Sequence, residues 1–291
     1  MPPLPFSIAG IGGMVLKGQA PRAGATICLH GGPGGHCQTL YPFFPPERLS
    51  GTWYFADIPN HGQSEHTDGD WSPETCLARL DAFAQTLDGP LRVAGLSWGA
   101  NVAAEWAATY PERFSCLVSI SGGGDLDAII AHQSAIIATM PPEVLALMAQ
   151  LEGAQGADQR ALSRQLWELT LPIWMATNPG LARYQEGTRG FASDPTAARA
   201  YHATWLEPLL NPAHIQSLFE RIATPSLLIR GLNDQMGDAR CGIDAYIKAP
   251  AVDILLLEDA GHCPFVDQPE RFFSAVEAFF DRVDALGPPA P

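Results

Sequence analysis

A Gly-x-Ser-x-Gly motif between a strand and a helix is the feature that most constrains this chain. Residues 95–99 read Gly-Leu-Ser-Trp-Gly, after an apolar run at 91–94 and before a segment at 100–108 that is rich in helix formers. The two glycines permit a sharp turn, because a Cβ at either position would crowd it. A serine on such a strained turn holds its Oγ where a carbonyl group can reach it. The motif therefore predicts a nucleophile, Ser97, at the end of a strand.

Strand-like and helix-like segments alternate along the chain on both sides of this turn. Short apolar runs predict strands at 25–29, 52–56, 91–96, 116–120, 226–230 and 252–257. Ser72 as N-cap and Pro73 in the first turn predict a helix to about Leu87, and a last amphipathic helix is expected from Pro269 to about Leu286. Strands separated by helices of this length predict an α/β fold with a mostly parallel central sheet flanked by helices.

The alternation of strands and helices stops after three glycines at 122–124. Residues 125–222 read helical and contain no strong strand. The segment begins and ends at strand ends, the side on which α/β proteins bind ligands. We therefore interpret 125–222 as an all-helical cap inserted after the strand at about 116–120, with 1–124 and 223–291 as the core. The alternative is a separate helical domain without a role in the site.

Composition and charge exclude several classes of partner. The formal net charge is −14, which argues against nucleic acid and against anionic membrane surfaces. No uncharged apolar run approaches the roughly 20 residues that span a bilayer, and no secretory signal is visible at the N-terminus. The six cysteines are scattered without a C-x-x-C pair, so a cytoplasmic protein with reduced thiols and no bound metal is expected. The sequence has no feature that specifies an oligomeric state.

A serine nucleophile needs a base, and the base needs an orienting acid. In this kind of fold the chain order is serine, acid, histidine. Asp234 follows the strand at 226–230, and His262 lies between the last strand and the last helix. Both side chains are therefore expected at strand ends, as Ser97 is.

Other residues compete for these roles and are weaker candidates. Alternative acids are Asp238, Asp253 and Glu258, and Asp234 itself could be an ordinary turn residue. Alternative bases are His30, His36, His61, His66, His132, His202 and His214. Cys263 is disfavoured as a nucleophile because no base follows it in the chain.

A glycine-rich loop after the first of these strands predicts the second part of an oxyanion hole. The backbone N–H of Trp98 supplies one donor, and the loop His-Gly-Gly-Pro-Gly-Gly at 30–35 supplies the other. Pro33 has no N–H, which leaves Gly31, Gly32 and Gly34. A phosphate-binding loop is the alternative, but the Gly-Lys-Ser/Thr ending and the dinucleotide spacing are both missing.

Taken together, these residues resemble the α/β-hydrolase family over nearly the whole chain. The resemblance rests on motifs at 30–35, 57–64, 95–99, 231–234 and 261–262. It implies a Ser97–Asp234–His262 triad, and it places the second oxyanion donor on Gly32.

Two of the motifs resemble the proline iminopeptidase branch of that family. They are His-Gly-Gly-Pro-Gly at 30–34 and Gly-x-Ser-Trp-Gly at 95–99. That branch binds the α-amine of its substrate with a carboxylate in the cap, often in a Trp-Glu pair, which here implies Trp167 and Glu168, with Glu207 as a second carboxylate. Two features depart from that branch: Ala100 stands where it usually has a second glycine, and residues 57–64 are closer to the Asp-x-x-Gly-His-Gly-x-Ser of esterases and lactonases.

The sequence thus predicts a cofactor-free serine hydrolase acting on a small molecule or a short peptide. An iminopeptidase-like cleavage of a small amide is the first expectation, and cleavage of a small ester or lactone is the alternative. A ligand receptor with little turnover and an acyltransferase are further alternatives, which burst and steady-state kinetics and the choice of acceptor would distinguish.

Overall fold

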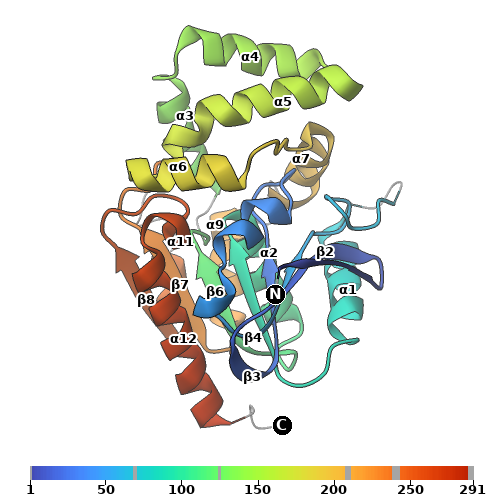
Figure 1. Cartoon of the computed structure of the whole chain (residues 1–291), viewed down its shortest axis with the longest axis vertical. Helices are drawn as coiled ribbons and strands as arrows, with labels where there is room; N and C mark the ends of the chain where they lie inside the picture. Colours follow the sequence, from blue (N-terminus) through green and yellow to red (C-terminus); the bar gives the residue numbers. More distant parts are fainter. Residues whose placement is uncertain (1, 68–70, 124–125, 207–210, 238–242, 288–291) are drawn as a thin grey trace.

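Eight strands form one twisted sheet at the centre of the computed structural model, which describes residues 2–67, 71–123, 126–206, 211–237 and 243–287 (Figure 1). Their order across the sheet is β1-β2-β4-β3-β5-β6-β7-β8. β1 pairs antiparallel with β2 and β2 with β4, whereas the strands from β3 to β8 run parallel. The strands are β1 (Leu4–Ile8), β2 (Ile11–Lys17), β3 (Ala20–Leu29), β4 (Ser50–Ala56), β5 (Leu91–Leu96), β6 (Phe114–Ile120), β7 (Ser226–Gly231) and β8 (Val252–Leu257).

Helices cover both faces of the sheet, because alternate residues of the inner strands are apolar on each side. Ile27, Val93 and Leu117 join one buried cluster with α1 (Pro73–Ala84), α2 (Trp98–Thr109) and α9 (Pro212–Arg221). Their neighbours Cys28, Ala94 and Val118 join a second buried cluster on the opposite face. The helices of that face are α11 (Pro264–Asp267) and α12 (Pro269–Leu286). The central strands are therefore buried on both sides, as their continuous apolar runs predict.

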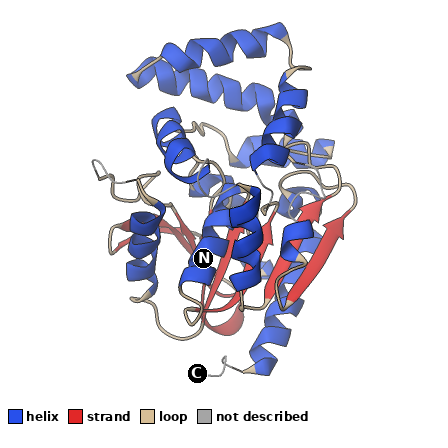
Figure 2. Cartoon of the chain, turned by 180° about the vertical axis from the view of Figure 1, so that it is seen from behind, coloured by secondary structure: helices blue, strands red, loops and turns tan. Residues whose placement is uncertain are grey.

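The remaining helices form a layer at the carboxyl ends of the parallel strands. Figure 2 shows the strand arrowheads directed toward this helical layer, which lies at the top of both views. Its elements are α3 (Leu126–Ile137), α4 (Pro142–Gly153), α5 (Gly156–Thr170), η4 (Leu171–Ile173), α6 (Asn178–Gly187), α7 (Pro195–Tyr201) and the π-helical turn η5 (His202–Leu206). Short elements complete the chain: η1 (Cys37–Thr39), η2 (Tyr41–Phe43), η3 (Pro46–Arg48) and α10 (Ile243–Tyr246).

The structure confirms the predicted α/β fold and corrects two details of it. The antiparallel strands β1 and β2 were not predicted, since Gly12 and Gly13 weaken the strand pattern. These glycines are required by packing, because a Cβ on Gly13 would lie 2.1 Å from the carbonyl oxygen of Phe55. The helix begun by Ser72 ends at Ala84 and not near Leu87, because the chain tightens there into hydrogen bonds between residues three apart.

Within the described parts of the chain, no single helix is both long and apolar enough to cross a membrane. Residues Ile129–Ile137 and Pro142–Gly153 reach that length only as a pair bent by 120°.

Candidate active site

Ser97 occupies a strained turn between β5 and α2. Its backbone has φ 55° and ψ −121°, a conformation that non-glycine residues rarely adopt. The positions two residues before and after Ser97 are packed too closely to hold a Cβ atom. A Cβ on Gly95 would lie 2.2 Å from the carbonyl oxygen of Gly99, and a Cβ on Gly99 would lie 2.2 Å from that of His30. The two glycines of the motif therefore allow the turn to contact the loop after β3.

The structure brings Asp234 and His262 together at the same edge of the sheet. Asp234 follows β7 and His262 follows β8. The Nδ1 atom of His262 lies 3.0 Å from Oδ1 and 2.9 Å from Oδ2 of Asp234, and both side chains are buried. With Nδ1–H donated to the carboxylate, Nε2 is the basic nitrogen. Nε2 has no hydrogen-bond partner among the described residues, so it is free to take a proton.

The charge of Asp234 is stabilised in spite of its burial. Burial alone would raise the pKa of its carboxyl group, but His262, the guanidinium of Arg230 and the backbone N–H of Met236 together hold that pKa below its ordinary value. Arg230 Nη2 lies 3.7 Å from Oδ2 of Asp234. The carboxylate is therefore ionised at neutral pH and can stabilise a positive charge on His262.

The backbone N–H groups near Ser97 distinguish between the candidate oxyanion donors. Gly32 lines the same cavity as Ser97 and Trp98. The N–H of Gly34 is donated to Nε2 of His61 at 2.9 Å and is therefore engaged elsewhere. Gly32 therefore stays the predicted second donor, and Gly34 is the less suitable of the three glycines that the sequence left open.

A cavity of about 170 Å³ lies beside these groups. Cavities for drug-sized ligands are usually about 300–1,000 Å³, so this one suits a smaller group. None of the described residues that line it is an aspartate or a glutamate. They are Gly32, Ser97, Trp98, Asn101, Ser121, Gly122, Gly123, Ile129, Ile130, Gln133, Trp174, His202, Arg230, Met236, Gly237 and His262.

The structure does not bring the predicted amine-binding residues to this cavity. Trp167 and Glu168 lie on α5 and line a different depression, with Gln185 and Arg189 of the neighbouring segment. Glu168 is exposed to solvent. The implied role of this pair in binding an α-amine therefore has no support in the arrangement. Glu207 lies outside the described residues.

The rival acids and bases are placed less favourably than the triad residues. Asp253 and Glu258 are exposed, and Asp253 pairs with Arg282 on α12. Asp238 lies outside the described residues. Of the other histidines, His202 lines the cavity, whereas His30 and His61 are buried with both ring nitrogens held by backbone groups.

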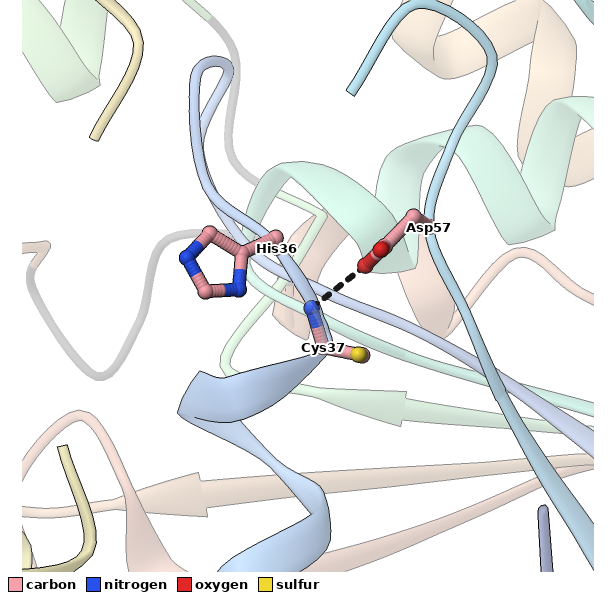
Figure 3. A group of neighbouring side chains, drawn as sticks. All are labelled: His36, Cys37 and Asp57. Atoms are coloured by element: carbon pink, nitrogen blue, oxygen red, sulfur yellow. Dashed lines mark hydrogen bonds between the residues drawn. The ribbon is translucent and has the colours of Figure 1, made fainter. Parts of the chain in front are cut away.

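Asp57, Cys37 and His36 form a group whose donor atoms lie within 4.8 Å of one another (Figure 3). These atom types could hold a metal ion, but they already have structural partners. Asp57 accepts hydrogen bonds from the N–H of Cys37 at 2.6 Å and of Gln63 at 2.7 Å. Burial raises the pKa of the Cys37 thiol, which disfavours the thiolate that metals bind, and raises the pKa of Asp57 to about 6. The group therefore has a structural role, because the Asp57 carboxylate joins η1 to the loop after β4.

Asp267 joins the helical layer to the loop that carries His262. It is buried, and its Oδ2 accepts hydrogen bonds from the N–H groups of Gly261 and Ala176, both at 2.9 Å. Its Oδ1 accepts from the N–H of Thr177 at 3.1 Å and from the hydroxyl of Thr177 at 2.7 Å. The N–H of His262 in turn donates to the carbonyl oxygen of Trp174 at 2.8 Å. The position of His262 therefore depends on contacts from the cap.

Three residues near the site were missed from the sequence, namely Arg230, Asp267 and Asn101. Asn101 lies one helical turn after Ser97, so the spacing of four residues within α2 could have placed it on the same side. The roles of Arg230 and Asp267 depend on contacts between distant segments, for which the sequence carries no local signal.

A sequence model of the alpha/beta hydrolase family matches residues 26–275. Among curated proteins, the chain is 25% identical over 270 residues to a pimeloyl-[acyl-carrier protein] methyl ester esterase of Neisseria meningitidis. That match covers 90% of this chain and 79% of the esterase.

Solved structures share the fold at low sequence identity. A proline iminopeptidase of Mycobacterium smegmatis has a TM-score of 0.69 and 18% identity, over 98% of this chain and 99% of that one. An alpha/beta fold family hydrolase of Bacillus anthracis has a TM-score of 0.71 and 15% identity, over 96% and 99%. At this identity the likeness concerns the fold alone.

Asp267→Asn tests the link between the cap and His262. The amide replaces one acceptor oxygen by an NH₂ group that faces backbone donors, so we expect a loss of about 2 kcal/mol or more in the free energy of unfolding. Urea unfolding measures this loss. Asp88→Asn, at an exposed position between α1 and β5, is the matched control. Equal stability of the two variants would contradict the assigned role of Asp267.

The burial of neutral His61 predicts that the folded state loses stability at acid pH. Burial lowers the pKa of His61 from 6.5 to about 4, so the folded state binds its proton less readily than the unfolded state does. The stabilisation is complete above pH 6.5 and is lost as the pH falls toward 4. The free energy of unfolding of the wild type should therefore fall by about 3 kcal/mol relative to that of His61→Gln over this range. A constant difference in urea unfolding between pH 7 and pH 4 would show that His61 is not buried in its neutral form.

Proposed function

Because the chain belongs to the alpha/beta hydrolase family, we propose that it is a serine hydrolase that cleaves small esters through an acyl-enzyme. The observation that carries the proposal is the contact of both Asp234 oxygens with Nδ1 of His262, which leaves Nε2 as a base on the cavity that Ser97 lines. Ordered in this way, the three side chains have the roles that activation of a serine requires.

In the proposed reaction, Ser97 Oγ attacks the ester carbonyl and His262 Nε2 takes its proton. The carbonyl oxygen becomes an oxyanion, which accepts hydrogen bonds from the N–H groups of Trp98 and Gly32. His262 then gives the proton to the departing alkoxide, and the acyl group remains on Ser97. A water molecule, deprotonated by His262, attacks the acyl-enzyme and releases the acid. Asp234 stays ionised and stabilises the imidazolium in both halves.

The charges around the cavity favour an ester over an amino-acyl amide. An α-ammonium group needs a carboxylate partner once it leaves water. The described residues on the cavity include no carboxylate, and they do include the guanidinium of Arg230. Glu168 faces a different depression. Iminopeptidase-like cleavage, implied by the motifs at 30–34 and 95–99, is therefore the second candidate.

A side-by-side rate comparison separates these two candidates. We expect measurable turnover of short p-nitrophenyl esters and much slower turnover of prolyl arylamide, because the cavity offers an α-ammonium group no partner. Ser97→Ala should reduce ester turnover by about 10⁴-fold or more. Glu168→Gln, an exposed amide-for-acid change, should leave both rates within about twofold of the wild type.

Two outcomes would contradict this assignment. Efficient cleavage of prolyl arylamide that Glu168→Gln weakens, with ester turnover spared, would favour the iminopeptidase. A burst of p-nitrophenol without steady-state turnover would favour a binding protein.

A further inference from the structure

We infer that the cavity contains a recognition site for an oxygen acceptor carried on the acyl group of the substrate, with Asn101 and Ser121 as the donors. This inference rests on the proposed function, because attack by Ser97 defines which part of the substrate is the acyl group. It extends that function by naming the chemical class of the acyl group.

The hydrogen bonds of Asn101 fix the direction of its amide. Its Oδ1 accepts a hydrogen bond from the N–H of Gly123 at 2.8 Å, and the residue is 6% exposed. A backbone N–H is always a donor, so the Asn101 atom that faces Gly123 must be the acceptor Oδ1. The NH₂ group of Asn101 therefore points away from Gly123. Asn101 lines the cavity, and no described residue accepts a hydrogen bond from Nδ2. The NH₂ group is therefore a donor available to a ligand.

Ser121 contributes a second donor from a strained position at the end of β6. Its backbone has φ 53°, and its N–H donates to the carbonyl oxygen of Ile229 at 2.9 Å. Its hydroxyl is buried without a hydrogen-bond partner among the described residues, and the residue lines the same cavity. A buried hydroxyl without a partner is unfavourable, and positive φ at a non-glycine residue adds strain. An acceptor on a ligand would satisfy this hydroxyl.

Arg230 holds the loop that follows Ser121 and also lines the cavity. Its Nη1 donates to the carbonyl oxygen of Gly122 at 2.8 Å, next to the N–H of Gly123 that Asn101 holds. Arg230 and Asn101 thus fix the loop that follows Ser121. Arg230 lines the cavity as well, and no described residue on the cavity is a carboxylate, so the lining favours an oxygen acceptor over an ammonium group.

The size of the cavity limits the length of the acyl group. Its other walls include the apolar side chains of Ile129, Met236 and Trp174. Asn101 lies in the first turn of α2, four residues after the N-cap Ser97, and side chains at this spacing are about 5–6 Å apart at Cβ. An oxygen on the fourth carbon of the acyl chain has about this reach from the scissile carbonyl. The inferred substrate is therefore an ester of a short acyl chain with an oxo or a carboxylate oxygen near that carbon.

Three isosteric methyl esters test this inference. Methyl 4-oxopentanoate carries an oxo group, monomethyl succinate carries a carboxylate, and methyl 4-methylpentanoate carries methyl groups in the same places. The small methanol leaving group lets the acyl chain occupy the cavity. We expect at least one oxygen-bearing ester to exceed the methyl isostere in kcat/KM by about tenfold, the effect of one or two hydrogen bonds. Whichever of the two oxygen-bearing esters is hydrolysed faster shows whether the site prefers an oxo group or a carboxylate.

Asn101→Asp is the decisive variant, because its carboxylate can still accept the hydrogen bond from Gly123 but no longer donates. We expect it to lower kcat/KM for the oxygen-bearing esters about tenfold more than for the methyl isostere. Ser121→Ala should act in the same direction without a change of charge. Gln150→Glu, an exposed amide-to-acid change on α4, is the matched control. Melting temperatures establish that each variant is folded.

The outcomes separate failure of this inference from failure of the proposed function. Turnover of all three esters at equal kcat/KM, or an equal loss on all three in Asn101→Asp, would overturn the inference and leave the hydrolase intact. If none of the esters is hydrolysed, the proposed function fails, and calorimetric binding of the same esters to Ser97→Ala decides the inference. Tighter binding of an oxygen-bearing ester that Asn101→Asp abolishes would support it, and equal binding of all three would overturn it.

Discussion

The close approach of the β5–α2 turn to the loop after β3 is the constraint on which the site depends. A Cβ on Gly99 would lie 2.2 Å from the carbonyl oxygen of His30, so only glycine permits this contact. β3 and β5 are neighbours at the point where the strand order reverses, where open α/β sheets bind ligands. Because the two loops touch there, Gly32, Ser97 and Trp98 line the same cavity.

Buried polar side chains hold the surrounding loops by accepting hydrogen bonds from the backbone. Neutral His61 accepts from Gly34 in the glycine-rich loop, and Asp57 joins the segment after β4 to η1. Asp267 accepts from Gly261, beside His262, and from two residues of the cap. Buried backbone donors need such partners, so each side chain sets the place of a segment that bears on catalysis. The helical layer at the carboxyl ends of the strands therefore contributes to the position of His262.

The sequence alone was sufficient to predict the parallel sheet and the positions of Ser97, Asp234 and His262 after three of its strands. These predictions rest on local signals: apolar runs, turn glycines, and polar residues directly after strands. Their catalytic roles stay predictions, whereas the fold and the family are established. The direction of Glu168 could not be predicted, since it depends on which face α5 presents to its neighbours. Asn101 and Asp267 likewise acquire their partners, Gly123 and Gly261, only when segments distant in the sequence meet.

The central claim is that Ser97 is a nucleophile activated by His262. Labelling with a fluorophosphonate followed by peptide mass mapping tests it most directly, because the reagent forms a stable bond only with an activated serine. The account predicts one adduct per chain on the peptide that contains Ser97, none in Ser97→Ala, and strongly slowed labelling in His262→Ala. Labelling of Ser97→Ala at the wild-type rate, or an adduct on a different residue, would contradict it.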